Sequence, residues 1–90
     1  MNRVVLRGSE IDSIEALHDL LRRELHLPEY YGGNLDALWD CLTGCIPMPL
    51  TIEWVDFAQC RRNIGEYADK VLSLFEDATK EVDGFMYVLR

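Results

Sequence analysis

Apolar residues recur along the chain with two different spacings, one typical of strands and one typical of helices. Short apolar or alternating runs predict strands, which cover Val4–Leu6, Leu50–Trp54 and Phe85–Leu89. Apolar residues three or four positions apart predict helices, which cover about 13–25, 35–44, 55–63 and 66–82. The predicted order of elements is therefore βααβααβ.

Capping residues and glycines mark the ends of these helices. Asp12 or Ser13 is suited to begin the first helix and Asn34 the second, because these side chains accept hydrogen bonds from free backbone N–H groups. Gly44 is placed to end the second helix. The glycines and the proline between the two helices predict a loop over residues 26–34.

Strands that alternate with helices pair in parallel through right-handed crossovers. We therefore expect an α/β fold in which a three-stranded parallel sheet packs against helices, forming one domain over residues 1–90. The large aromatic residues and two of the cysteines are expected in its core, namely Trp54, Phe57, Phe75, Phe85, Cys41 and Cys60. The order of the strands does not follow from the pattern.

The composition is that of an ordinary globular protein. Of the 90 residues, 49% are hydrophobic and 28% are charged, which suffices for a core without metals or disulfides. The three cysteines are an odd number without CxxC spacing, which favours reduced thiols in the cytoplasm. The first apolar run is only three residues long, so we expect neither a signal peptide nor a membrane span. His18 and His26 are expected to be structural.

Acidic residues outnumber basic ones and are concentrated in the middle of the chain. The net charge is −7, which disfavours nucleic acid as a direct ligand, because phosphate contacts need Lys and Arg. Residues 24–60 contain six acids and no Lys or Arg. Such a stretch attracts a basic partner and speeds its approach. The alternative is that these acids only keep the protein soluble.

The predicted second helix has an apolar side and an acidic side. The acidic side holds Asp36, Asp40 and Thr43, with Trp39 at its edge, opposite a row of leucines. Like charges one turn apart cost on the order of 0.2–0.5 kcal/mol, and no base lies within four residues to offset this cost. Aromatic residues beside uncompensated acids suit a hot spot for a cationic pocket, and a solvated polar face is the alternative. A role of Asp36 and Asp40 as metal ligands or as an acid–base pair is disfavoured, because no His, third acid or phosphate loop accompanies them.

Residues 27–44, which read LPEYYGGNLDALWDCLTG, closely resemble the barstar family of bacterial intracellular ribonuclease inhibitors. The resemblance extends over the whole chain, through Pro49-Leu50, Glu53-Trp54 and Val71–Phe75. It implies an inhibitor, not an enzyme, with no cofactor and no metal. It also implies a chain that is monomeric when free and forms a 1:1 complex with a basic, secreted ribonuclease of the barnase type. The family pattern further implies a cis Met48–Pro49 bond.

The resemblance implies a mechanism in which carboxylates imitate the phosphates of RNA. Asp40 would enter the phosphate-binding pocket of the nuclease, and Asp36 would pair with bases at the rim. Tyr30 would stack against the catalytic histidine of the nuclease. The remaining contacts would come from Asn34, Trp39, Thr43, Gly44, Cys45 and, on the helix 66–82, Asp77.

Two residues of the implied surface depart from the family pattern. Cys45 stands where the family has a tryptophan after Thr-Gly, and Asp77 is shorter than the expected glutamate. A fold can be kept while its partner changes. The alternative function is therefore an immunity protein that uses the same fold against a different nuclease or toxin.

Overall fold

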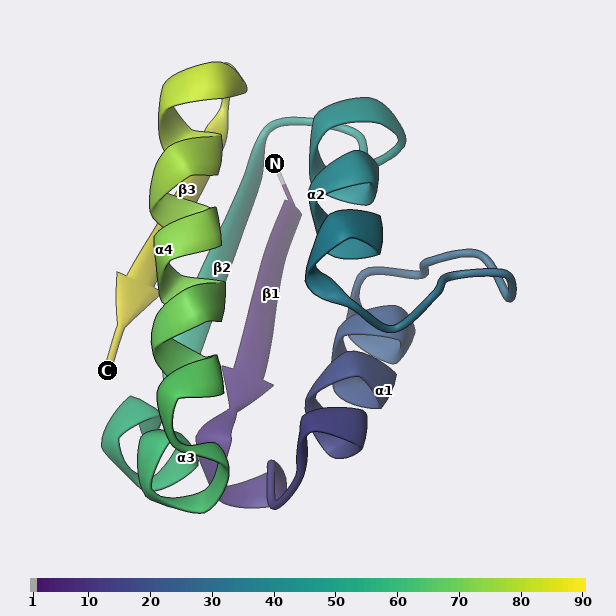
Figure 1. The fold of residues 1–90 in the computed structure, drawn as a ribbon. Helices are drawn as coiled ribbons and strands as arrows, with labels where there is room; N and C mark the ends of the chain where they lie inside the picture. Colours follow the sequence, from purple (N-terminus) through teal and green to yellow (C-terminus); the bar gives the residue numbers. More distant parts are fainter. Residues whose placement is uncertain (1) are drawn as a thin grey trace.

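The described part of the chain, residues 2–90 of a computed structural model, has the predicted α/β fold. Its strands β1 (Asn2–Arg7), β2 (Leu50–Val55) and β3 (Phe85–Leu89) form one parallel sheet in the order β1-β2-β3. The central strand is therefore β2, and each crossover leads to a neighbouring strand. The first and last strands form the two edges of the sheet (Figure 1).

Helices cover one face of this sheet. They are α1 (Ile14–Glu24), α2 (Leu35–Gly44), α3 (Phe57–Ile64) and α4 (Glu66–Glu81). In Figure 1, α4 and α2 run side by side in front of the sheet, α1 continues below α2, and α3 lies at the lower end. None of the helices within residues 2–90 has the length and apolar character to cross a membrane.

The core lies between the sheet and these helices. Along β2, buried and half-buried residues alternate, so that Leu50, Ile52 and Trp54 point toward the helices. Trp54 packs edge to face against Phe75 of α4, with ring centroids 5.8 Å apart. The residues expected in the core are buried, apart from a half-buried Phe57: they are Trp54, Phe75, Phe85, Cys41 and Cys60.

The predicted start of α1 and the predicted end of α2 are both found, with one refinement each. Ser13, and not Asp12, caps α1, because its hydroxyl accepts a hydrogen bond from the Ala16 N–H at 3.0 Å. The helix α2 ends at Gly44 as predicted, but Gly44 is itself helical, and the chain leaves the helix at Cys45 (φ −130°, ψ −2°). The Met48–Pro49 bond is cis, as the family pattern implied.

The junction between β2 and α3 differs from the prediction. Val55, the expected start of the short helix, is the last residue of β2, and Asp56 turns the chain with a positive φ of 55°. A 3-10 turn at Gly8–Glu10, which the pattern did not predict, packs against this junction. A Cβ at Gly8 would collide with the carbonyl oxygens of Val55 and Asp56. Two segments distant in sequence therefore fix this turn.

Candidate partner-binding surface

The start of α2 is fixed by its cap, and its orientation is fixed by its leucines. The side-chain oxygen of Asn34 accepts a hydrogen bond from the Ala37 N–H at 2.8 Å, which begins the helix there. Leu38 and Leu42 are fully buried in the core. Because they face inward, Asp36 and Asp40 face solvent, and both are exposed.

These two carboxylates have no cationic partner within the described residues. None of the five ion pairs found in residues 2–90 includes Asp36 or Asp40, and neither side chain accepts a hydrogen bond there. Asp36 lies in the first turn of α2, where the helix dipole favours a negative charge. Asp40 lies one turn further and lacks this compensation. The negative charge of this face is therefore free to act on another molecule.

A shallow groove separates α2 from α4 and joins acids from both helices. Its volume is about 300 Å³, and it is lined by Leu35, Asp36, Trp39, Lys70, Ser73, Leu74 and Asp77. Asp36 and Asp77, predicted from separate parts of the sequence, thus line one groove. Trp39 is half-buried and packs against the core, so its ring forms a fixed wall. Lys70 places one positive charge beside these acids without forming an ion pair to either of them within 4.0 Å.

The end of α2 carries three further predicted residues, and all three are exposed. The Thr43 hydroxyl donates to the Trp39 carbonyl oxygen at 2.8 Å, so its side chain is partly engaged by its own helix. Gly44 has open space around it. The Cys45 thiol lies close to that of Cys41. Burial raises the pKa of Cys41 to about 11, and the hydrogen bond with Cys45 adds to this effect.

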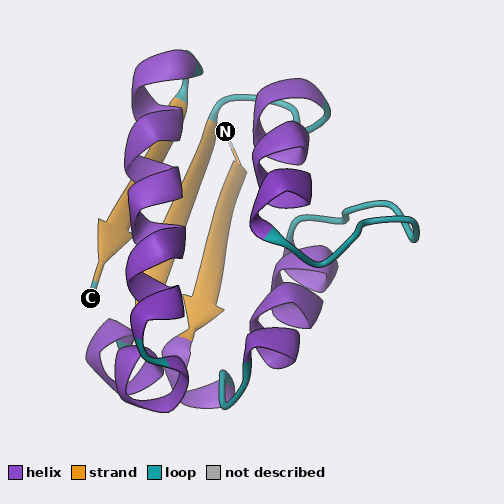
Figure 2. Cartoon of the chain, viewed as in Figure 1, coloured by secondary structure: helices purple, strands orange, loops and turns teal. Residues whose placement is uncertain are grey.

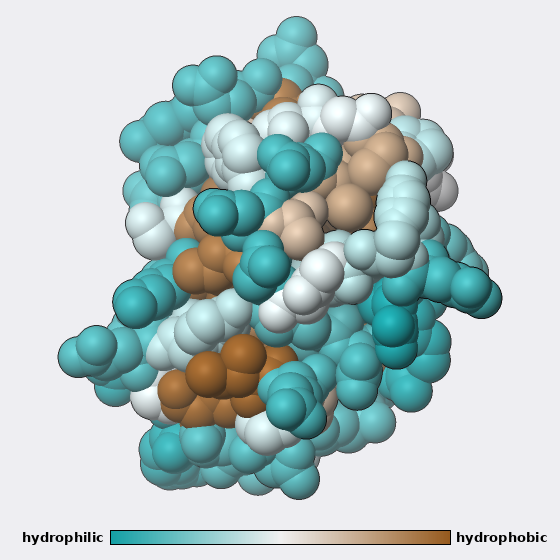
Figure 3. Space-filling view, turned by 45° about the vertical axis from the view of Figure 1, so that its right-hand side comes forward, coloured by the Kyte–Doolittle hydropathy of each residue, from teal (hydrophilic) through white to brown (hydrophobic). Residues whose placement is uncertain are grey.

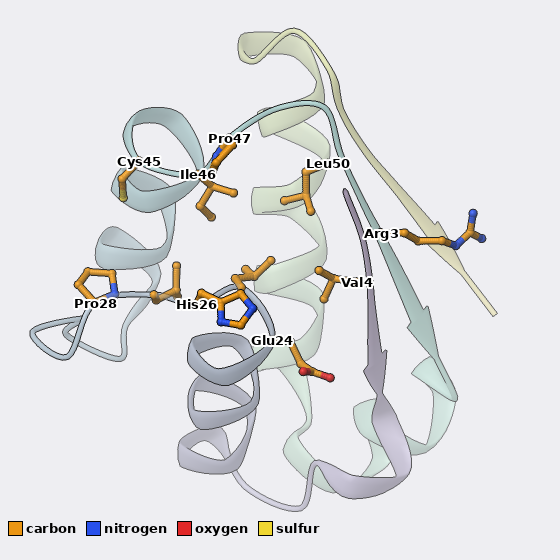
Figure 4. Close-up of a pocket in the computed structure, with 11 residues that line it drawn as sticks. Arg3, Val4, Glu24, His26, Pro28, Cys45, Ile46, Pro47 and Leu50 are labelled. Carbon is orange, nitrogen blue, oxygen red and sulfur yellow. The ribbon is translucent and has the colours of Figure 1, made fainter. Parts of the chain in front are cut away.

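A larger cavity of about 460 Å³ lies on another side of α2. Of the predicted surface residues, only Cys45 lines this cavity. Figure 4 shows it between the ends of α1 and α2 and the strands, with Val4 and Leu50 facing Cys45 and Pro28 across it. Arg3 points away from it.

Within residues 2–90 no group of three His, Cys, Asp or Glu side chains is arranged to hold a metal ion.

The loop between α1 and α2 presents Tyr30. Figure 2 shows this loop projecting from the body of the molecule beside α2. A turn in it is closed by the Tyr31 N–H, which donates to the Pro28 carbonyl oxygen at 3.0 Å. Tyr30 is 81% exposed, whereas the Tyr31 ring turns inward and is half-buried. Adjacent tyrosines therefore have opposite roles, one displayed and one anchoring.

The face that bears α1, α2 and the loop is mostly polar. Figure 3 shows this side of the molecule as largely hydrophilic, with hydrophobic atoms confined to separate small areas. A surface of this kind suits recognition by charge and by a few aromatic contacts more than by one large apolar patch.

Reasoning from the sequence missed two features around this surface. Lys70 and Ser73 line the groove. Their spacing of three and four residues from one another and from Asp77 places them on the same face of the helix, and this spacing could have identified them. His18 was expected to be structural and is buried, but its two tyrosine partners were not foreseen.

Comparison with known proteins identifies a family and a relative. A family model described as "Barstar (barnase inhibitor)" matches residues 1–89. A protein of Bacillus subtilis (strain 168), named "Putative ribonuclease inhibitor YrdF", is 42% identical over 90 residues, which cover 99% of each chain. Both matches span the strands, the helices and the acidic face described above.

Proposed function

Since this chain belongs to the barstar family, we propose that it inhibits a basic, secreted ribonuclease of the barnase type by blocking the active site. Family membership and the name of the Bacillus subtilis relative support a ribonuclease inhibitor and indicate no catalysis by this chain. The recognition surface consists of Tyr30, Asn34, Asp36, Trp39, Asp40, Thr43, Gly44, Cys45 and Asp77. The inhibitor acts in the cytoplasm, as a monomer that binds one nuclease.

The observation that carries this proposal is the pair of exposed, unpaired carboxylates on consecutive turns of α2. No ion pair within the described residues offsets their mutual repulsion. A nuclease must place cationic groups where RNA phosphates bind, because catalysis stabilises the negative charge of the transferring phosphate. Carboxylates presented on a rigid helix meet those cations and occupy the place of the substrate.

In this mechanism each residue contacts a different part of the nuclease. Asp40 enters the phosphate-binding pocket, where its carboxylate accepts hydrogen bonds from the cationic groups of the nuclease. Asp36 and Asp77 hold a further cation from two sides of the groove, against the Trp39 ring. Tyr30, on the projecting loop, stacks against the catalytic histidine.

The test is a titration of the chain into a barnase-like ribonuclease while RNA hydrolysis is measured. We expect inhibition to be complete at one equivalent and to be competitive with an active-site nucleotide. The double variant Asp36→Asn/Asp40→Asn keeps the shapes of the side chains and removes both charges, so inhibition should be lost. The matched control is Glu15→Gln/Asp12→Asn, which removes the same charge from exposed residues at the start of α1. Equal inhibition by both double variants would contradict the mechanism.

The second candidate is an immunity protein for a different nuclease or toxin. It is favoured by the small Cys45 side chain at the end of α2 and by the short Asp77 side chain on α4, two positions where this chain departs from the family pattern. Binding to a different basic toxin, lost on the same double substitution and absent with barnase-like ribonucleases, would select this candidate.

A further inference from the structure

The cavity of about 460 Å³ beside α2 lies outside the proposed recognition surface, apart from Cys45 at its edge. Most of the side chains that line it are apolar, namely Val4, Leu25, Leu27, Pro28, Ile46, Pro47 and Leu50. The polar residues of its lining are Arg3, Glu24, His26 and Cys45. A concave site of this size, largely apolar with a few polar groups, is typical of sites that bind small organic molecules.

One of these polar groups, Glu24, is a carboxylate without an ion partner among residues 2–90. It is the last residue of α1 and is half-buried. None of the five ion pairs found in this part of the chain includes it. Arg3 pairs with Glu53 at 3.3 Å instead, and its guanidinium points away from the cavity in Figure 4. A negative charge at the carboxyl end of a helix is opposed by the helix dipole, so the stability of the fold does not explain this carboxylate.

The carboxyl ends of α1 and α2 both border the cavity. The residues directly after these helices, within 25–28 and 45–47, line it. The N–H groups of Cys45 and Ile46 both donate to the Cys41 carbonyl oxygen, at 3.0 and 3.2 Å, so the carbonyl groups at the very end of α2 accept no backbone hydrogen bond within the described chain. The last turn of α2 holds no basic residue. Both helix ends therefore add negative potential around the cavity.

The carboxylate and the apolar residues lie at different places along the cavity. In Figure 4, Glu24 lies at one end and Ile46 and Pro47 lie at the other, with Val4 and Leu50 of the strands along the side between them. A molecule that fills this space therefore meets apolar side chains over most of its length and one negative charge at one end.

We propose that this cavity is a binding site for a small organic amine, whose apolar body packs along Val4 and Leu50 and whose ammonium group pairs with Glu24. A neutral molecule would leave this carboxylate without a partner, and an anion would be repelled by it and by the two helix ends. His26, which also lines the cavity, offers a ring nitrogen for a further hydrogen bond from the ammonium group. The site is independent of the proposed inhibition of a ribonuclease.

The test in the free protein compares three probes that share one apolar body and differ in charge: 4-phenylbutylamine, 4-phenylbutan-1-ol and 4-phenylbutanoate. Each is titrated into the ¹⁵N-labelled chain, and the amide chemical shifts are followed. We expect the amine to shift residues 24–28 and 45–47 and to bind roughly three- to tenfold more tightly than the alcohol, the range of one partly buried charge contact. The carboxylate should bind more weakly than both. Equal affinity for the amine and the alcohol, or shifts confined to the exposed face of α2, would overturn the proposal.

The first variant removes the charge of the carboxylate and keeps its shape. In Glu24→Gln, the affinity for the amine should fall to that for the alcohol, while the affinity for the alcohol stays unchanged. The matched control is Glu29→Gln, because Glu29 is an exposed acid close by in sequence that does not line the cavity. This control should keep the preference for the amine. Loss of the preference in both variants would mean that the net negative charge of the chain, and not Glu24, attracts the amine.

The second variant fills the apolar end of the cavity. Ile46 is half-buried and lines this end, so Ile46→Phe should occupy space that the phenyl ring of the probes needs. We expect the amine and the alcohol to lose affinity together, by tenfold or more, while denaturant unfolding shows that the chain still folds. Undiminished binding of both probes by the folded variant would show that they bind elsewhere. If this variant does not fold, the Glu24→Gln comparison decides the proposal alone.

Discussion

The proposed recognition surface on α2 and the open face of the sheet use carboxylates in opposite ways. On the open face, Glu53 of β2 is held between two arginines, with its oxygens 3.3 Å from Arg3 Nε and 2.8 Å from Arg90 Nε. The hydrogen bond from Arg90 lowers the pKa of Glu53, and the hydrogen bond from Arg3 lowers it further by a smaller amount. On α2, Asp36 and Asp40 have no such partners within the described residues.

The difference separates a charge that serves the fold from charges that remain available to a partner. When a carboxylate is paired with a base of its own chain, the positive charge of that base cancels most of its electric field nearby. Such a carboxylate attracts a cation of another molecule only weakly. A carboxylate without an ion partner contributes little to the fold but keeps its interaction for another molecule.

The largest effect is expected from Asp40→Ala. If this carboxylate enters a cationic pocket, its loss leaves the partner's charges buried and unpaired, which costs about 2–5 kcal/mol of binding free energy. The free energy of unfolding should hardly change, because Asp40 has no internal partner. Calorimetry of the complex and denaturant unfolding of the free chain measure the two quantities. Binding weakened by less than about 1 kcal/mol would remove Asp40 from the centre of the interface.

The next effect is expected in the rate of association. The unpaired acids should attract a basic nuclease over a distance that salt shortens, with a Debye length of about 10 Å at 0.1 M and about 3 Å at 1 M. Stopped-flow measurements should therefore show association slowing by about tenfold or more over this range, with a smaller change in dissociation. A rate that does not depend on salt would refute the steering role of this surface.

A smaller effect of opposite sign is expected from Lys70→Ala. This lysine lines the groove beside Asp36 and Asp77 and repels a basic partner. Its removal should raise affinity roughly two- to fivefold, the range of an exposed charge contact. Lys80→Ala is the matched control, because it removes an exposed lysine of α4 that does not line the groove. Equal effects of the two variants would mean that only net charge matters.

The smallest effect on binding is expected from Glu53→Gln, which should leave the dissociation constant unchanged. Because the pKa of Glu53 is lowered in the folded chain, its carboxylate stabilises the fold above about pH 4.3, and this contribution is lost as the pH falls through the folded pKa. The thermal unfolding midpoint of the variant should lie below that of wild type at pH 7, and the difference should shrink as the pH falls below about 4.3. A constant difference between the two midpoints would contradict this account.

The sequence predicted what local pattern controls. The alternation in β2 and the leucines of α2 determine which side chains face the core, and Asn34 marks the start of α2 by its own hydrogen bond. The lack of bases between residues 24 and 60 predicted that Asp36 and Asp40 have no ion partner near them in sequence. Within residues 2–90, distant residues supply none either.

What the sequence could not predict depends on contacts between distant segments. Asp56 has a positive φ where its carbonyl group lies close to Gly8, and no pattern around Val55 reveals this turn. The groove that joins Asp36 and Asp77 exists only because α2 packs beside α4. One hydrogen-bond partner of the buried His18 is Tyr67, which is 49 residues away along the chain.

The position of β3 at the edge of the sheet has a consequence for the behaviour of the chain at high concentration. An edge strand exposes a row of backbone donors and acceptors to which another strand can add. Two arginines in β1 discourage such addition on one side, whereas Phe85–Leu89 contains no charge and exposes Met86. Aggregation during overproduction should therefore start at β3, and Met86→Lys is the substitution that protects this edge while leaving α2 untouched.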